Sequence, residues 1–187
     1  MGTKAAIGLV VLICLFSGLA RSDTIGLYAD PSGTNCNIYA TTPFVLTNVY
    51  VVPVAPLGTS GSAFSAPTPA CWAGAVWIGD QDPFCLIGCG DSQTGKMVGY
   101  GHCFVGSILV STIMYLTQSP SEPCCAYPVL PHPSSPGGQI EVADCDFNMG
   151  SAAGLMAIVN GNATCPCGYP VPVEETTWGH VKSLFGE

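Results

Sequence analysis

Eleven cysteines among 187 residues constrain this chain more than any other feature. Ten of them lie beyond residue 30, and an even number in a chain exported to an oxidising compartment predicts up to five disulfides, each stabilising by about 2–4 kcal/mol. Spacing leaves most of the connectivity open. Cys124 and Cys125 point apart in an extended chain and are expected to find different partners, whereas Cys85 and Cys89 can close a small loop. The ten are Cys36, Cys71, Cys85, Cys89, Cys103, Cys124, Cys125, Cys145, Cys165 and Cys167.

The remaining cysteine, Cys14, lies in a segment with the layout of a secretory signal peptide. Lys4 supplies a positive start, residues 5–16 are apolar, and small residues end the segment at Ala20. The apolar run is shorter than the roughly 20 residues of a membrane span. We therefore expect residues 1–20 to be cleaved after Ala20, with cleavage after Ser22 as the second choice, and expect a secreted, cell-surface or periplasmic protein.

The composition of the chain favours one folded domain and excludes several classes of protein. Hydrophobic residues make up 48% and charged residues only 9%, which fits neither a disordered chain nor a coiled coil. Four Lys and Arg against twelve Asp and Glu give a net charge of -8, which argues against nucleic-acid binding. No low-complexity linker divides residues 21–169, so we expect a single disulfide-rich domain there.

The periodicity within that domain is that of β-strands. Short runs rich in Val, Ile, Tyr and Thr are separated by Pro, Gly, Ser and Asn. The clearest runs are 44–54 and 107–116, and both faces of the second are apolar enough to be covered. About eight strands without an amphipathic helix between them predict an all-β, antiparallel sandwich with Ig-like or jelly-roll-like Greek-key connections. Weaker strand candidates are 24–29, 75–78, 97–104, 125–130, 139–145 and 155–159.

Loops are predicted where turn-forming residues cluster. The expected loops are 30–33, 56–69 and 131–138, of which the second is long enough to be mobile or functional. Asn160 and Gly161 form a dipeptide that favours a type I′ turn.

The segment 170–187 is expected to be a tail with a short amphipathic helix. Trp178, Val181 and Phe185 recur at helical spacing, after prolines that set the segment apart. A helix of this length is marginal in water and needs a surface to pack on. That surface is either the chain's own domain or another protein, in which case the three side chains form a docking stripe.

Catalysis would have to begin with the histidines, and none of them stands in a convincing arrangement. His102 precedes Cys103, but strand neighbours point to opposite faces and cannot share a proton. His132 lies between two prolines and His180 lies in the tail. The segment Gly58–Ser62 resembles a nucleophile elbow but ends in serine where the elbow needs glycine. We therefore expect no catalytic residue and no enzyme activity, with a small secreted hydrolase as the third-ranked alternative.

Metal binding has two forms in this sequence. A thiolate zinc site at the closely spaced cysteines is disfavoured because export makes disulfides the expected state. Calcium is the better hypothesis because hard cations take oxygen ligands, although the spacing matches no EF-hand loop and solvated carboxylates are the alternative. We expect no cofactor, with calcium kept as a side hypothesis. The carboxylates concerned are Asp80, Asp82, Asp91, Asp144 and Asp146.

Four aromatic residues permit a carbohydrate-stacking face as the alternative to a structural role. Trp72, Trp77, Tyr100 and Tyr115 combine apolar rings with polar edges, although Trp77 lies in an apolar run and is expected in the core. Such aromatics gathered with the aspartates in one concavity would favour a sugar- or calcium-binding module. Scattered positions would favour a structural or adhesive domain, which is the leading hypothesis.

The order of motifs resembles a group of uncharacterised secreted bacterial Cys-rich β proteins that end in a TTWG-type tail. The resemblance rests on Thr24–Asp30, Asp91–Gly95, Gly138–Cys145, Asn160–Cys167 and the tail around Thr177–Gly179. It implies an exported bacterial source and brings no activity or ligand. Asn162-Ala163-Thr164 is an N-glycosylation sequon, which matters only if the source glycosylates exported chains, and a bacterial source makes this glycosylation less expected. The resemblance also favours the interpretation that the tail docks or sorts the protein, with another surface or secreted protein as the partner.

Deleting residues 170–187 tests that interpretation. If the tail docks or sorts, the truncated domain keeps its melting temperature, because the expected strands and disulfides lie upstream, but it changes location or loses a partner. If the tail belongs to the core, Trp178→Ala costs about 3–5 kcal/mol, as truncating a buried aromatic does. Thermal melting and localisation are measured in parallel, and a large fall in melting temperature with unchanged localisation removes the docking hypothesis.

Overall fold

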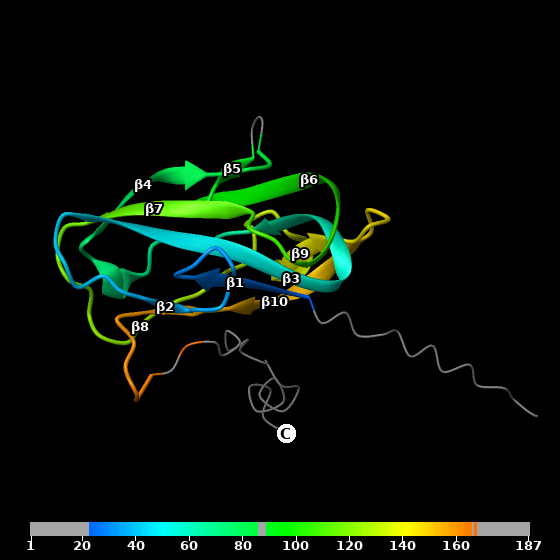
Figure 1. Cartoon of the computed structure of the whole chain (residues 1–187). Coiled ribbons are helices and arrows are strands. Elements are labelled where there is room, and N and C mark those ends of the chain that lie inside the picture. Colours follow the sequence, from blue (N-terminus) through cyan, green and yellow to red (C-terminus); the bar gives the residue numbers. More distant parts are fainter. Residues whose placement is uncertain (1–22, 86–88, 166, 168–187) are drawn as a thin grey trace, which may run out of the picture.

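The computed structural model describes residues 23–85, 89–165 and 167, and in these residues the fold is all-β (Figure 1). They form strands and two short 3₁₀ turns, η1 (Ala70–Trp72) and η2 (Pro136–Gly138), with no α-helix among them. The all-β sandwich expected from the sequence is confirmed. The strands are β1 (Thr24–Tyr28), β2 (Asn37–Ile38), β3 (Val45–Phe64), β4 (Ala75–Gln81), β5 (Gly90–Asp91), β6 (Gly95–Ser107), β7 (Ser111–Thr117), β8 (Cys125–Tyr127), β9 (Ile140–Ala143), β10 (Met149–Leu155) and β11 (Ala157–Val159).

The 20-residue strand β3 organises the larger sheet. Its first half pairs antiparallel with β7, from Val45 opposite Thr117 to Val51 opposite Ser111. Its middle pairs with β1, and its second half pairs with β6 and β9. The pairing with β6 shifts register between Ala55 and Gly61, as β-bulges do where a strand bends. The two halves of this one bent strand therefore carry different neighbours in the larger sheet, β7 on the first half and β6 and β9 on the second.

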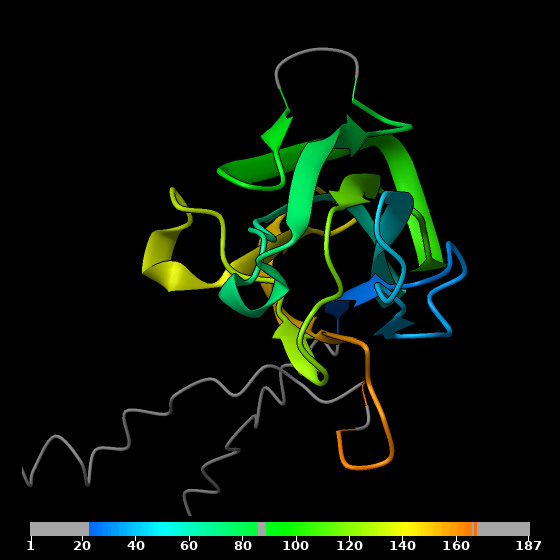
Figure 2. The same ribbon diagram turned by 90° about the vertical axis from the view of Figure 1, so that its left-hand side faces the viewer.

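Strand β1 closes part of this sheet into a ring. It pairs antiparallel with β3 and parallel with β10, while β10 pairs with β9 and β9 pairs with β3. Figure 2 looks along the molecule and shows the strands arranged around its centre. The smaller sheet has the order β2-β11-β8, with β2 parallel to β11. The predicted antiparallel pairing is therefore correct for the remaining strand pairs. The two parallel pairs form where β10 lies beside β1 and where β11 lies beside β2.

Alternation along the strands fills a single core. In β7, Ile113 and Tyr115 are fully buried, whereas Met114 and Leu116, which alternate with them, are half-buried. Trp72 from η1 is also fully buried, with its ring centroid 4.7 Å from that of Tyr115. The core therefore joins residues far apart in sequence. Its largest fully buried apolar side chains are Trp72, Tyr115, Tyr127, Phe64, Ile25, Leu27, Ile38 and Ile113.

Five disulfides use all ten expected cysteines. Cys124 and Cys125 bond to different partners and Cys85 bonds to Cys89, as the sequence predicts. Around the smaller sheet, one bridge joins η1 to β8, and two bridges join the segment after β11 to the residues just before β2 and just before β8. The pairs are Cys36–Cys167, Cys71–Cys125, Cys85–Cys89, Cys103–Cys145 and Cys124–Cys165.

The prediction of a loop over residues 56–69 is wrong for residues 56–64, which continue β3. Their Pro, Gly and Ser content is typical of a loop, but two glycines here serve close packing. A Cβ on Gly58, whose φ is 96°, would lie 2.5 Å from the Cys145 sulfur. A Cβ on Gly61 would lie 3.0 Å from the Val98 carbonyl oxygen of β6. Small residues are therefore needed where β3 passes against a disulfide and a neighbouring strand.

Other strand boundaries also differ from the prediction. The run 107–116 is interrupted, because Ser107 ends β6 and β7 begins only at Ser111. The run 155–159 divides into the end of β10 and β11. Strands β2 and β5 were not predicted, since two-residue strands have no period to detect, and residues 149–154 of β10 were missed because this Gly- and Ala-rich segment lacks the β-branched residues typical of strands.

Asn160 adopts φ 52°, but Gly161 does not have the positive φ that a type I′ turn requires, so that prediction is wrong. Instead the Asn160 side chain joins three segments: its Oδ1 accepts from the Ala40 amide (2.8 Å), and its Nδ2 donates to the carbonyls of Ala40 and Ser121. The expected signal peptide, 1–20, and the helical tail, 170–187, lie outside the described residues.

Replacing Asn160 by Ala should lower the free energy of unfolding by about 2–4 kcal/mol. The change leaves partly buried backbone groups unpaired, and alanine adopts a positive φ less readily than asparagine does. Denaturant unfolding of the oxidised protein measures the loss. Asn162→Ala is the matched control: Asn162 is exposed and bonds only within its own turn. Equal losses in the two variants would contradict the role assigned to Asn160.

Candidate functional site

The outward face of β4, β7 and the first half of β3 carries apolar side chains in rows across the strands. In one row Leu46 of β3 lies opposite Leu116 of β7, which lies opposite Val76 of β4. Met114 occupies the next outward position of β7, beside a bulge of β4 that contains Ile78. Residues directly opposite one another in a sheet share a face. We call this set of five side chains the β4–β7–β3 face.

Solvent reaches this face. Leu46 is 67% exposed, Ile78 52% and Val76 40%, while Met114 and Leu116 are half-buried between them. On β7 itself the outward Thr112 is buried and Met114 and Leu116 are half-buried, so the prediction that both faces of this strand are largely covered is confirmed, and the exposed side chains belong to β3 and β4. The inward side packs in the core, so the strands are held in place without a partner on the outside. A grouped apolar surface of this kind marks an interaction site more often than isolated exposed residues do.

The β4–β7–β3 face is also uncharged, in a chain with a net charge of -8. Asp80 is the only charged residue in β4, β7 and residues 45–50 of β3, and it is engaged with Lys96 and Trp77. Phe44, which is 77% exposed, extends the apolar surface at the start of β3. Strand β4 pairs with β7 alone among the described strands, so it forms an edge of the sheet. The face therefore suits apolar contact rather than ionic contact.

Behind this face lies a fully buried lysine, a feature that the sequence analysis did not detect. The Nζ atom of Lys96, at the start of β6, lies 2.8 Å from Oδ2 of Asp80 and 2.5 Å from Oδ2 of Asp82. Its side chain has no exposed surface, and the Asp side chains are 5% and 11% exposed. Ser111 Oγ of β7 lies 3.3 Å from the same Nζ. The ammonium group thus joins β6 to β7 and to the end of β4.

The carboxylates proposed as calcium ligands do not gather in one place. Asp80 and Asp82 face Lys96, while Asp91 accepts hydrogen bonds from the amides of Gln93 and Thr94 in its own turn. The remaining two, Asp144 and Asp146, lie in the loop after β9, where Asp144 accepts from its own turn. Among the described residues no three His, Cys, Asp or Glu side chains form a group that could hold a metal.

Another acidic loop, after β1, is also internally bonded. Asp30 accepts from the Ser32 hydroxyl and from the amides of Thr34 and Asn35. The Ser32 hydrogen bond, followed by those amides, lowers the pKa of Asp30 to about 2. This carboxylate serves to hold its own loop.

The aromatic residues proposed for sugar stacking are mostly in the interior. Trp72, Tyr100 and Tyr115 are buried, and Trp77 packs partly buried against the core as expected. The Tyr100 hydroxyl donates to Ser62 Oγ at 2.8 Å, and the Tyr115 and Tyr127 hydroxyls lie 2.6 Å apart. Burial raises the pKa of each of these three phenols. The aromatics and the aspartates therefore occupy scattered positions rather than one concavity.

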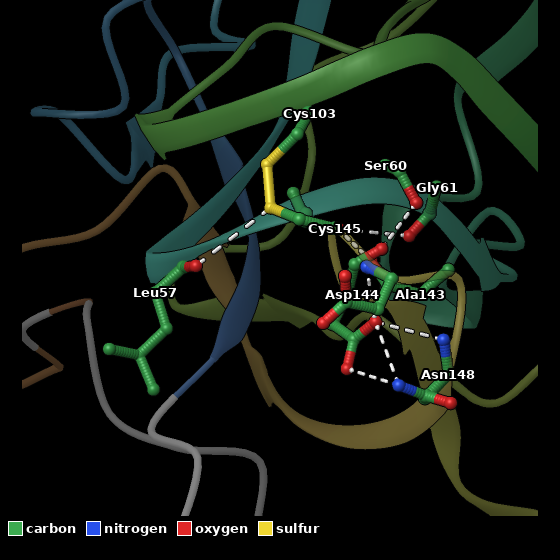
Figure 3. The surroundings of a disulfide bond; sticks show 10 residues. Leu57, Ser60, Gly61, Cys103, Ala143, Asp144, Cys145 and Asn148 are labelled. Carbon is green, nitrogen blue, oxygen red and sulfur yellow. Dashed lines mark hydrogen bonds between the residues drawn. A yellow bond between two sulfur atoms is a disulfide. The ribbon is translucent and has the colours of Figure 1, made fainter.

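The groups considered for catalysis are occupied in other ways. Ser60 lies inside β3 rather than on a turn, and its hydroxyl donates to the Asp144 carbonyl at 2.6 Å beside the Cys103–Cys145 disulfide (Figure 3). The nucleophile-elbow resemblance is thereby excluded. His102 is exposed with its ring against Phe104, and the Nδ1 atom of His132 accepts from the Ser134 amide. These two histidines are not brought together with Ser60 or with a carboxylate.

His180 and the proposed docking residues Trp178, Val181 and Phe185 lie outside the described residues. None of the described residues forms a helix that could serve as a membrane span.

No protein-family model matches this sequence, and no curated protein matches it. Among solved structures, it is similar to the sixth cohesin from scaffoldin B of Acetivibrio cellulolyticus, at 9% identity and a TM-score of 0.47 over 75% of this chain and 99% of that one. It is also similar to the seventh ScaB type I cohesin from Pseudobacteroides cellulosolvens (11% identity, TM-score 0.46, 79% and 97% covered). A non-cellulosomal cohesin from the archaeon Archaeoglobus fulgidus gives 12% identity and a TM-score of 0.44, with 76% and 93% covered. At these values no binding partner or activity is transferred to this chain.

Two features of the sequence could have identified the buried lysine and the exposed apolar face. Lys96 is the only Lys or Arg between residues 21 and 182, and it lies in an alternating segment, which is unusual for a solvated cation. Leu46, Met114 and Leu116 are apolar at alternate positions of two strands whose other face is apolar as well. Such doubly apolar strands are either covered on both sides or expose one side for binding, and the sequence does not distinguish the two.

The buried tyrosines predict alkaline unfolding. Because the pKa values of Tyr100, Tyr115 and Tyr127 are raised in the folded state, their contribution to stability is present below pH 10 and is lost as the pH rises above it. Absorbance of tyrosinate and near-UV circular dichroism, followed together from neutral to alkaline pH, should show these phenols ionising only as tertiary structure is lost. Tyr100→Phe should reduce the change in tyrosinate absorbance that accompanies the loss of tertiary structure, whereas Tyr39→Phe, at an exposed residue, should not. Complete ionisation with an unchanged dichroism spectrum would contradict the burial.

Proposed function

We propose that the exported chain is a non-enzymatic, disulfide-stabilised adhesive module that binds a partner protein through the β4–β7–β3 face. The observation that carries this proposal is the cross-strand group of exposed apolar side chains on an uncharged face of an acidic domain. Burial of apolar surface is the dominant favourable term in most protein association. The partner accordingly presents an apolar surface of its own.

A protein partner is favoured over a sugar by the side chains that reach solvent. Carbohydrate stacking uses flat aromatic rings, and three of the four rings considered for it, Trp72, Tyr100 and Tyr115, are buried. The β4–β7–β3 face instead offers Leu, Val, Ile and Met side chains. Their shape and lack of hydrogen-bonding groups suit the apolar centre of a protein interface.

The disulfides support the proposed location. Five bridges in one domain form and persist in oxidising compartments, which include the cell surface, the extracellular space and the bacterial periplasm. They also maintain a domain whose interaction face is exposed before its partner arrives. The tail around Trp178 is a second, independent docking hypothesis, with sorting or anchoring to another surface protein as its role.

Charge substitution on the face tests the proposal. The disulfide-bonded domain captures its partner from the native cell surface, and the partner is then purified for titration. Leu46→Asp and Ile78→Asp should each weaken binding at least tenfold, equivalent to about 1.4 kcal/mol, because each places a carboxylate in a dry apolar contact. Wild-type affinity should change little between low and high salt, since no ion pair contributes.

Val105→Asp is the matched control, because Val105 is 72% exposed on β6, outside the defined face. It should leave the affinity within twofold of wild type. Equal affinity for all the folded variants would exclude this face. Self-association that Leu46→Asp abolishes, or glycan binding that both face variants retain, would replace the partner-protein proposal by a different occupant.

A further inference from the structure

The buried contact between Lys96 and two aspartates has the components of a covalent cross-link. The Lys96 Nζ atom touches Oδ2 of Asp82 at 2.5 Å and Oδ2 of Asp80 at 2.8 Å, and the lysine side chain is wholly buried. Burying an ion pair removes both charges from water, a cost that Coulomb attraction often does not recover. A reaction that eliminates one positive and one negative charge at this place would leave one buried carboxylate, Asp80, instead of three buried charges.

The two aspartates are held differently. Asp80 receives three hydrogen bonds besides its contact with Lys96: from Trp77 Nε1 (3.0 Å), Ser92 Oγ (2.8 Å) and the Ser92 amide (2.6 Å). Asp82 receives none of these, and its buried Oδ1 has no hydrogen-bond partner within the described part of the chain. Asp80 is therefore held in place by several donors and can serve as a proton acceptor. One oxygen of the Asp82 carboxyl group, in contrast, is bound by no hydrogen-bond donor within the described part of the chain.

We propose that Lys96 and Asp82 join in an intramolecular isopeptide bond. In the first step a proton passes from the Lys96 ammonium to the Asp82 carboxylate in contact with it, which leaves a neutral amine beside a neutral carboxylic acid. The Nζ lone pair attacks Cγ of Asp82, and Asp80 accepts the proton that the attacking nitrogen releases. Asp80 then returns this proton to a Cγ hydroxyl, the C–O bond breaks and one water leaves. The Nζ–Cγ amide remains, Asp80 is again a carboxylate, and no oxidant or reductant is required.

Position makes this intramolecular condensation feasible. Well-oriented intramolecular groups reach effective concentrations of about 10⁵–10⁸ M, and the folded sheet holds amine and carboxyl in contact. The bond would link the residue after β4, an edge strand, to the start of β6, which otherwise pairs with β3 and β5. This inference does not depend on the proposed binding function.

The intact mass of the fully reduced, denatured exported protein tests the bond. Wild type should weigh about 18 Da less than its processed sequence, the mass of one water. Lys96→Arg should show the full sequence mass, because a guanidinium does not become a nucleophile at neutral pH. Asp80→Ala keeps both reacting groups but lacks the proton acceptor, and it should also show the full mass. Asp82→Asn should lose about 17 Da, because ammonia then leaves instead of water.

Proteolysis locates the bond. Lys96 is the only trypsin site between residues 21 and 182, and an acylated lysine is not cleaved. Reduced wild type should therefore stay uncut at position 96, while Lys96→Arg is cut there, and fragment spectra should join Lys96 to Asp82. A wild-type chain of full sequence mass that trypsin cuts after Lys96 would overturn the proposal, whatever the variants do. A loss of 18 Da whose fragments place it elsewhere, as in a succinimide, would overturn it as well.

Discussion

Backbone pairing along β3 is the constraint on which the larger sheet depends. This one strand pairs with β1, β6, β7 and β9, and the strands β4, β5 and β10 attach through those neighbours. It can pair with four strands because it bends at a register shift and carries glycine where other chain segments approach closely. The exposed apolar face and the buried lysine both follow from this arrangement, since β7 and β6 are held on opposite halves of the same strand.

Most of the fold class could be predicted from the sequence, because strand periodicity and an even cysteine count are local properties. The alternation in residues 44–54 identifies a strand directly. The continuation to Phe64 could not be predicted, since Pro56, Gly58 and Gly61 look like loop residues until the disulfide and the β6 backbone beside them are known. The disulfide partners of Cys124 and Cys125 could be separated by strand geometry, but which cysteine each meets depends on tertiary contacts.

The site was less predictable than the fold. Lys96 is recognisable as a solitary cation, yet its two carboxylate partners come from β4 and from the residue after it, and the pairing of β4 with β7 and of β7 and β6 with β3 brings them beside it. Asp80 and Asp82 looked like metal ligands because the sequence shows their spacing and not the ammonium between them. The aromatic residues were ambiguous for a similar reason: Trp72 lies in a short turn whose burial is decided by Tyr115 and Tyr127, which are distant in sequence.

The Cys36–Cys167 bridge has a mechanical consequence for a protein held at its two ends. It connects positions separated by 131 residues, near the beginning and the end of the described chain. Tension applied at residues 23 and 167 passes through β1, reaches Cys36 and crosses directly to Cys167. The intervening strands, including β3 and the β4–β7–β3 face, lie off that path and cannot be extended while the sulfur–sulfur bond is intact. Under tension such a domain would lengthen only by the stretch from residue 23 to residue 36, which includes β1, and the strands from β2 to β11 would be bypassed.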